Sequence, residues 1–177
     1  MKKSLAPFAL LVVVGLFVAC AKKNPAQEIP MPAQASAVLN PTAGNAVQGT
    51  VHFKQEANGV RVIAEVSGFV RPGFHGFHVH EIGDCSAPDA SSAGGHFNPH
   101  GTEHGKAGEG VHHAGDLPSL NADEEGNAKL NALLDGIELA GEHSIIGRSL
   151  IVHADPDDYI SQPTGNAGPR VACAVIQ

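Results

Sequence analysis

The 177-residue sequence contains no tryptophan and a single tyrosine, and aromatic residues make up only 5% of it. Basic residues are also scarce, because 11 lysines and arginines stand against 18 aspartates and glutamates. The formal net charge is −7, and no run of basic residues is long enough to follow a phosphate backbone. Nucleic-acid binding needs concentrated positive charge and stacking rings, so we expect no nucleic-acid partner.

The sequence also lacks any long segment with a 3.6-residue apolar period, so we expect little helix. Short segments of mainly β-branched and other apolar residues dominate instead, most of them bounded by Gly, Pro, Asn or Asp. Residues 58–59 (Asn-Gly) and 125–127 are the clearest turns. The pattern predicts an all-β sandwich or barrel of antiparallel strands. The predicted strands are residues 47–53, 60–66, 76–81, 129–134, 149–152 and 170–176.

The N-terminus has the features of an export signal. Lys2 and Lys3 precede an apolar stretch, residues 5–18, that is too short and too early for a membrane-spanning helix. Residues 17–20 (Phe-Val-Ala-Cys) resemble a bacterial lipoprotein signal, in which residues 1–19 are removed and Cys20 is lipidated. An ordinary cleaved signal peptide is the alternative. Residues 20–35 are rich in Pro, Ala, Lys and Gln, which predicts a flexible tether to a domain spanning 36–177.

The sequence has only three cysteines. If Cys20 carries lipid, Cys85 and Cys173 remain as a pair in an oxidising compartment, where we expect them to form a disulfide. They are 88 positions apart in the chain.

Histidine is unusually abundant in this sequence. Eleven histidines occur, most of them singly, beside glycines or within strand-like segments. His78 and His80 stand two positions apart on a predicted strand, so both imidazoles point to the same face and can form half of a metal site. Neutral imidazole is a good ligand for copper and zinc, so we interpret the pattern as metal binding.

The order and spacing of six histidines, an aspartate, the cysteine pair and a late arginine resemble the copper–zinc superoxide dismutase family of the bacterial periplasmic or lipoprotein type. The resemblance covers nearly everything from Ser36 to Gln177. It implies an immunoglobulin-like Greek-key β-sandwich or barrel with two long loops over the metal site. Residues 82–117 and 153–169 would be those loops.

The resemblance also implies the ligands. Copper would be held by His78, His80, His96 and His153, and zinc by His96, His104, His113 and Asp116. His96 would bridge the two metals. By spacing alone, His100 and His112 are rival ligands. Asp157 would link a copper histidine to a zinc histidine, with Asp155 and Asp158 as rivals.

The function implied is dismutation of superoxide to O₂ and H₂O₂ by an oxidoreductase whose copper cycles between two oxidation states. His96 and Arg170 would be the catalytic residues, the first as a proton donor and the second as the cation that guides the anion. A non-catalytic copper- and zinc-binding or copper-delivery lipoprotein is the alternative. A zinc hydrolase is disfavoured, because the sequence has no His-Glu-x-x-His motif.

The sequence predicts that the protein is exported from a bacterial cell and anchored to a membrane through Cys20, on the periplasmic side or at the cell surface. A homodimer is compatible with the resemblance, since bacterial relatives occur as monomers and as dimers. We expect Lys106 to supply part of the steering of the anion, with a solvated loop lysine as the alternative. We expect His75 in a strand or behind the ligands, His52 and His143 in solvent, and Arg148 in a structural ion pair.

Overall fold

The computed structural model describes residues 34–177, and the predicted signal, Cys20 and nearly all of the tether lie outside this range. The described part consists of nine strands and one short 3₁₀ turn, η1 (Ser91–Ala93). The strands are β1 (Gln34–Pro41), β2 (Gln48–Glu56), β3 (Gly59–Ser67), β4 (Gly73–His75), β5 (Phe77–His80), β6 (Leu120–Ala122), β7 (Asn127–Leu134), β8 (Ser149–His153) and β9 (Arg170–Val175). None of the helical structure in residues 34–177 is long and apolar enough to cross a membrane.

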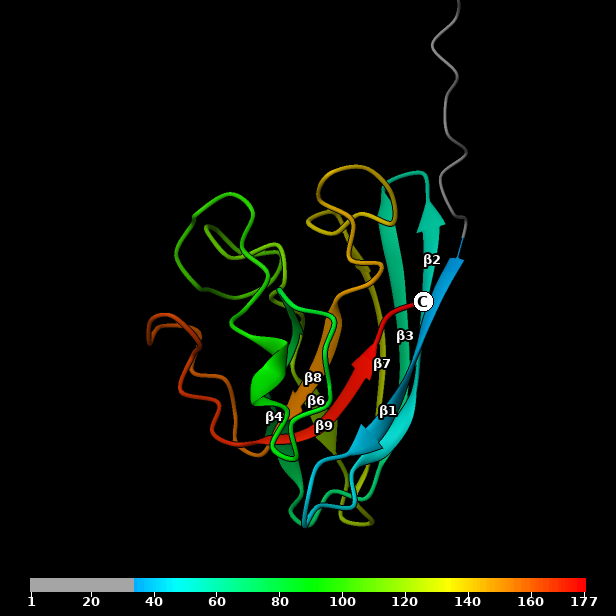
Figure 1. Ribbon diagram of the computed structural model, residues 1–177, viewed down its shortest axis with the longest axis vertical. Coiled ribbons are helices and arrows are strands. Elements are labelled where there is room, and N and C mark those ends of the chain that lie inside the picture. Colours follow the sequence, from blue (N-terminus) through cyan, green and yellow to red (C-terminus); the bar gives the residue numbers. More distant parts are fainter. Residues whose placement is uncertain (1–33) are drawn as a thin grey trace, which may run out of the picture. The chain divides into compact units, whose positions relative to one another are not determined.

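The strands form a sheet in the order β4-β6-β7-β3-β2-β1-β9-β8-β5, and every pair in it is antiparallel. β1 joins its two halves. Residues Gln34 to Leu39 pair with β2, whereas Asn40 and Pro41 pair with β9. Figure 1 shows β9 and β8 facing the β3 and β7 side, so the sheet closes on itself like a barrel. The predicted all-β Greek-key architecture is confirmed.

Alternation along the strands builds the core. In β3 the side chains of Val60, Val62, Ala64 and Val66 are buried, while the residues between them are exposed or half-buried. Ala57 and Asn58 form the tight connection from β2 to β3, one residue earlier than the predicted turn at 58–59. Gly59 begins β3 with a φ of 140° that favours glycine. The six predicted strands are all present. β1, β4 and β6 were not predicted, and β1 begins at Gln34, two residues before the boundary placed at 36.

β5 and β8 differ from the other strands because every residue in both is buried. One face of β5 carries Phe77 and Val79 into the core. The other face carries His78 and His80, and it is covered by the two long connections, residues 81–119 and 154–169. In Figure 1 these loops lie beside the sheet, in green and in orange to red. The two buried strands and the loops over them position the candidate site.

Candidate metal centre

The first long loop folds back onto β5 and brings distant residues next to the strand histidines. The Phe97 N–H donates to the Val79 carbonyl over 2.8 Å, and the Val79 N–H donates to the Gly115 carbonyl over 2.8 Å. These bonds create two isolated bridges, one between His80 and His96 and one between His78 and Asp116. Residues far apart in the sequence therefore converge because the loop backbone pairs with β5.

The structure brings together the seven predicted ligand residues as two groups of four that share one residue. In each group, the potential ligand atoms all lie within 4.8 Å of one another, and every side chain is buried. The first group comprises His78, His80, His96 and His153, and the second comprises His96, His104, His113 and Asp116. These are the sets that the resemblance assigned to copper and to zinc.

In the first group, each imidazole has one nitrogen bonded to protein and one without a partner among residues 34–177. The His80 Nδ1–H donates to the Gly94 carbonyl over 2.9 Å, and the His153 Nδ1–H donates to the Gly168 carbonyl over 3.1 Å. Four buried nitrogens are left over: His78 Nδ1, His80 Nε2, His96 Nε2 and His153 Nε2. Unpaired buried polar atoms are costly, and a bound metal ion would satisfy all four. The all-nitrogen donor set fits copper.

The second group converges on one carboxylate oxygen. Asp116 Oδ1 lies 3.0 Å from His96 Nδ1, 3.0 Å from His104 Nδ1 and 3.5 Å from His113 Nδ1. Its other oxygen accepts hydrogen bonds from the Gly105 and His113 N–H groups over 3.1 and 2.8 Å, which fixes the carboxylate. Three imidazole nitrogens and one carboxylate oxygen are a donor set that suits four-coordinate zinc.

His96 is the residue that the two groups share. Its Nε2 belongs to the four unpartnered nitrogens, and its Nδ1 faces Asp116. One imidazole ring therefore presents its two nitrogens to two different metal positions. This arrangement fits a bridging imidazolate, since two cations lower the proton affinity of the ring between them.

Asp157 also links the two groups, through ring nitrogens of His78 and His104 that do not face the metal positions. It accepts hydrogen bonds from His78 Nε2–H over 2.7 Å and from His104 Nε2–H over 2.9 Å. The two rival aspartates are placed elsewhere, because Asp155 pairs with Arg71 over 3.3 Å and Asp158 caps backbone N–H groups within its own loop. Of the three, only Asp157 contacts the histidines of the site.

Burial and hydrogen bonding set the protonation of the histidines. Burial lowers the pKa of His78 to about 4, that of His80 to about 2 and that of His153 to about 3, so these rings are neutral in the absence of metal. Neutral imidazole is the form that binds metal ions. Burial also disfavours the charged form of His104, but hydrogen bonds to Asp116 and Asp157 outweigh it and raise its pKa to about 9.

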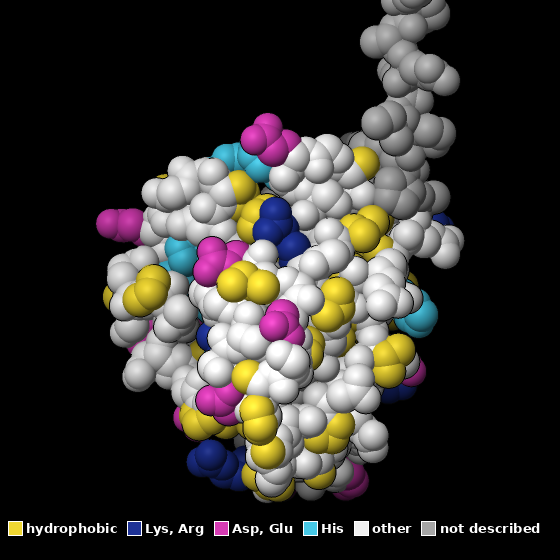
Figure 2. All heavy atoms as spheres, in the orientation of Figure 1, with side chains coloured by type: hydrophobic (Ala, Val, Ile, Leu, Met, Phe, Trp, Pro, Cys, Tyr) yellow, Lys and Arg dark blue, Asp and Glu magenta, His cyan; other side chains and the backbone are white. Residues whose placement is uncertain are grey.

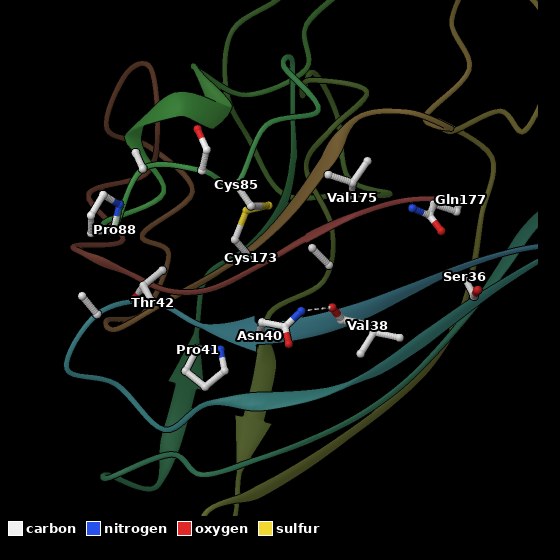
Figure 3. Close-up of a pocket in the computed structure, with 14 residues that line it drawn as sticks. Ser36, Val38, Asn40, Pro41, Thr42, Cys85, Pro88, Cys173, Val175 and Gln177 are labelled. Atoms are coloured by element: carbon white, nitrogen blue, oxygen red, sulfur yellow. Dashed lines mark hydrogen bonds between the residues drawn. A yellow bond between two sulfur atoms is a disulfide. The ribbon is translucent and has the colours of Figure 1, made fainter.

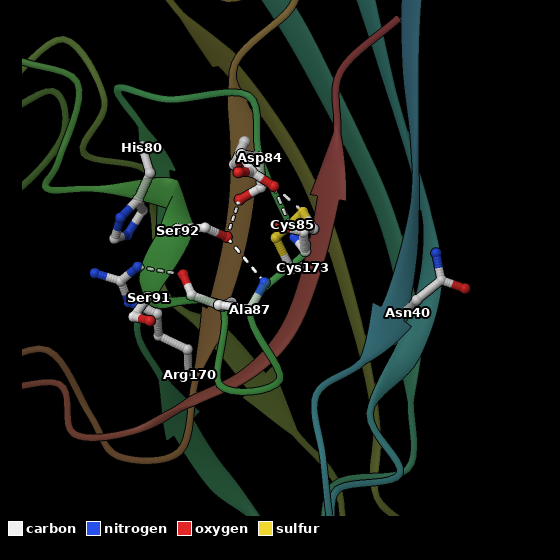
Figure 4. The surroundings of a disulfide bond; sticks show 12 residues. Asn40, His80, Asp84, Cys85, Ala87, Ser91, Ser92, Arg170 and Cys173 are labelled. Atoms are coloured by element: carbon white, nitrogen blue, oxygen red, sulfur yellow. Dashed lines mark hydrogen bonds between the residues drawn. A yellow bond between two sulfur atoms is a disulfide. The ribbon is translucent and has the colours of Figure 1, made fainter.

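Arg170 lies beside the first group, at the start of β9. Its guanidinium donates to the Ala90 carbonyl over 2.5 Å and to the Gly94 carbonyl over 2.6 Å. The Gly94 carbonyl is also the acceptor for His80, so arginine and ligand share one anchor. Figure 4 shows the Arg170 guanidinium next to the His80 ring. The cation is thus fixed at the edge of the predicted copper position.

The predicted disulfide is present. Cys85 and Cys173 are bonded, with their Cα atoms 5.9 Å apart. The bond ties the first long loop to β9 three residues after Arg170, as Figure 4 shows. Cys173 packs with Ala90, Ala93 and Ile151 in a small apolar cluster separate from the main core. The disulfide and this cluster therefore both hold the loop segment that supplies the carbonyls for Arg170.

The rival histidine ligands lie outside both groups. His100 is exposed, and its ring packs edge-on against that of His143 with 4.6 Å between the centroids. His112 Nδ1–H donates to the His113 carbonyl over 2.8 Å. The prediction that His143 faces solvent is only partly right, because contact with His100 leaves it half-buried. His52 is exposed, as predicted.

Two further predictions concern residues behind the ligands. His75 is on β4 and buried, and its Nδ1 lies 3.1 Å from the carbonyl of His153, as expected for a histidine behind the ligands. Arg148 forms no ion pair with any residue between 34 and 177, so the predicted ion pair is wrong. Arg148 packs on the Phe97 ring, 3.6 Å from its centroid, and donates to the Glu81 carbonyl. The partners of the Arg148 guanidinium are thus the Phe97 ring and backbone carbonyls, and not the expected carboxylate.

Charges on the surface are dispersed. On the face shown in Figure 2, Lys and Arg side chains stand singly among acidic and hydrophobic ones. Lys106, the predicted steering residue, forms a 2.6 Å ion pair with Glu109. This ion pair was not predicted, although a lysine and a glutamate three positions apart in a loop were a signal for it.

A groove lies outside the metal groups, between the outer face of β1 and the disulfide. Its lining includes Val38, Asn40, Pro88, Cys173 and Val175, as Figure 3 shows, and it contains none of the seven ligand residues. The candidate chemistry of the described residues is therefore concentrated at the buried histidines and at Arg170.

One comparison with known protein families identifies a match. The family model described as copper/zinc superoxide dismutase (SODC) matches residues 47–176. The matched range includes all of the strands except β1, both long loops, and every residue of the two groups.

Proposed function

Because this chain belongs to the copper/zinc superoxide dismutase family, whose members bind copper and zinc, we propose that it converts superoxide to O₂ and H₂O₂. Two superoxide anions and two protons give one molecule of each product. We assign copper to His78, His80, His96 and His153, and zinc to His96, His104, His113 and Asp116. The observation that carries the proposal is the set of four convergent, buried and unpartnered imidazole nitrogens.

When bound, copper supplies a one-electron couple that accepts an electron from one superoxide and returns it to a second. The protein's task is then to hold the ligands neutral, bring in the anion and deliver protons. Neutral ligands are ensured by burial, which keeps the pKa of His78, His80 and His153 well below neutrality. No proton must leave these three rings before metal binds.

We propose that His96 Nε2 is the proton carrier. The Nδ1 side of its ring is held toward Asp116, so the ring keeps its place whether or not Nε2 carries a proton. A proton taken up at Nε2 is then positioned for transfer to the reduced substrate. General acid catalysis of this kind requires a donor that does not move away between turnovers.

Arg170 would bind the incoming anion. Two carbonyls hold its guanidinium on one side, and its remaining N–H groups are donors for a charge-assisted hydrogen bond. Burial lowers the pKa of Arg170, but an arginine keeps its charge at any physiological pH. The complete ligand set together with this arginine favours catalysis over storage or delivery of copper.

We also propose that the protein is a bacterial lipoprotein on the periplasmic or outer side of a membrane, anchored through Cys20. The support comes from the sequence of residues 1–20 and from the Cys85–Cys173 disulfide, which suits an oxidising compartment. Mass spectrometry of the mature N-terminus tests this part. A free, unmodified cysteine or a different first residue would contradict it.

Metal analysis combined with superoxide removal tests the function. The purified protein should contain one copper and one zinc per chain and remove superoxide at a rate that is proportional to copper content. His96→Ala should abolish activity and weaken retention of both metals, whereas His153→Ala should release copper and keep most of the zinc. The exposed His52 provides the control, because His52→Ala should change neither metal. Full loading with both metals but no superoxide removal would instead identify a metal-binding or delivery protein.

A further inference from the structure

We propose that Gln162 is a positioning residue for zinc, because its side-chain amide holds the backbone of His104. Gln162 Oε1 accepts a hydrogen bond from the His104 N–H over 2.8 Å. Its Nε2 donates to the His104 carbonyl over 3.0 Å. Two bonds to one residue fix both its position and its rotation, as a neighbouring strand would. The inference rests on the proposed assignment of His104 to zinc.

His104 needs such a partner because of its place in the fold. His78 and His80 are held by the pairing of β5 with β8. His153 is held by its pairing with Arg170 of β9 and by a hydrogen bond from its N–H to the Gly76 carbonyl over 2.8 Å. His104 lies in a loop without secondary structure, next to Gly105. Within residues 34–177, its N–H and carbonyl have no hydrogen-bond partner other than Gln162. The amide of Gln162 therefore takes the role that a neighbouring strand has for His78, His80 and His153.

Gln162 itself is held by its own loop. The Asp158 carboxylate accepts hydrogen bonds from the Ile160 and Ser161 N–H groups over 2.9 and 2.8 Å. The Gly165 N–H donates to the Ser161 carbonyl over 2.7 Å, which closes the turn that carries Gln162. Although the Gln162 side chain is exposed, its backbone is anchored on both sides.

The same loop approaches the His104 ring at a second point. A Cβ atom at Gly165 would collide with the Asp157 carboxylate and lie 2.5 Å from His104 Nε2, so the backbone there passes directly over the Asp157–His104 hydrogen bond. Gln162 holds the His104 backbone while Asp157 holds its imidazole. Loss of the amide should therefore loosen one zinc ligand and leave the copper ligands in place.

The test compares Gln162→Met with the matched control Gln55→Met. Gln162→Met keeps the length of the side chain and removes both hydrogen bonds to His104, together with a longer one of 3.3 Å from Nε2 to the Ile160 carbonyl. Gln55 also donates its amide to two carbonyls, those of Glu56 and Gly59, but at the β2–β3 turn. Both variants are loaded with copper and zinc, and zinc release to a chromogenic chelator is followed while copper is measured in the same samples. Cobalt placed at the zinc position adds a visible spectrum that reports its ligands.

We expect Gln162→Met to release zinc about tenfold faster than the unmodified protein, because two exposed amide bonds contribute in the lower part of the usual range. Copper retention should stay within twofold, the cobalt spectrum should change, and Gln55→Met should behave like the unmodified protein. Zinc release unchanged in Gln162→Met would overturn the inference, and so would an equal loss of both metals. An unmodified protein that binds copper but no zinc would instead overturn the assignment of His104.

Discussion

Removal of the Cys85–Cys173 disulfide should destabilise the protein by an amount that follows from the fold. The bond closes a loop of 88 residues, more than half of the described chain. In the chain-entropy description, closing a loop of that length stabilises the folded state by about 4–5 kcal/mol. For a domain of this size each kcal/mol shifts Tm by about 2–4 °C, so we expect a loss of about 8–20 °C.

Removal of the disulfide should also lower the rate of superoxide removal, because it affects the groups that hold Arg170. Ala90 and Gly94, whose carbonyls hold the guanidinium, follow Cys85 in the tethered segment. Without the disulfide, this segment retains hydrogen bonds such as that from the Ser92 hydroxyl to the Asp84 carbonyl over 2.9 Å, visible in Figure 4. The carbonyls should therefore become more mobile without being lost. We expect the rate of superoxide removal per bound copper to fall a few-fold at substrate concentrations below KM. The amount of bound metal should fall less.

The assay uses Cys85→Ala with Cys173→Ala, because alanine leaves no buried thiol or hydroxyl in the cluster around Ile151. Urea unfolding is measured with metals removed, since bound metal would add its own mass-action stabilisation. Reduction of the unmodified protein is the control that separates loss of the bond from loss of the sulfur atoms. A stability change below about 1 kcal/mol in both samples would refute the loop-closure reasoning. Unchanged activity per copper would refute the link to Arg170.

Asp157→Asn should weaken retention of both metals about 10–100-fold, because the amide can accept a hydrogen bond from His78 or His104 at one oxygen only; loss of one metal alone in a competition titration would contradict this. Lys106→Ala should lower the rate at low ionic strength by about twofold, and Glu109→Gln should raise it by a similar factor. Both effects should vanish near 0.5 M salt, where charges are screened beyond about 4 Å. Stopped-flow rates at several salt concentrations would check the signs.

Much of the fold was accessible from the sequence because six strands carry clear segments of β-forming residues with turn residues between them. β1 was missed because its buried positions are Ala35, Ala37 and Leu39, of which two are too small to stand out as an apolar face. β4 and β6 have three residues each, fewer than a periodic pattern needs. Their pairing depends on contacts between distant segments, which a local pattern does not contain.

The ligand positions were accessible because histidine and aspartate are chemically distinctive and their spacing matches a family. The atoms that hold these side chains in place were not. The Gly94 carbonyl anchors both His80 and Arg170, yet a backbone carbonyl looks the same at every position of a sequence. Gln162 is one polar loop residue among many until the fold places its amide against His104.

The steering charge shows the same limit. Counting residues identified Lys106 as the one lysine of the site-forming loops, but the field that reaches an approaching anion depends on neighbours. Glu109 lies 2.6 Å from its ammonium group and cancels most of its charge at long range, while the Tyr159 ring lies 6.0 Å away. Lys129 and Glu65, an exposed pair across β7 and β3, offer the matched comparison. If Lys129→Ala and Glu65→Gln change the low-salt rate as much as the loop variants do, net charge governs approach and Lys106 has no special role. Opposite effects confined to the loop pair would show that its position matters.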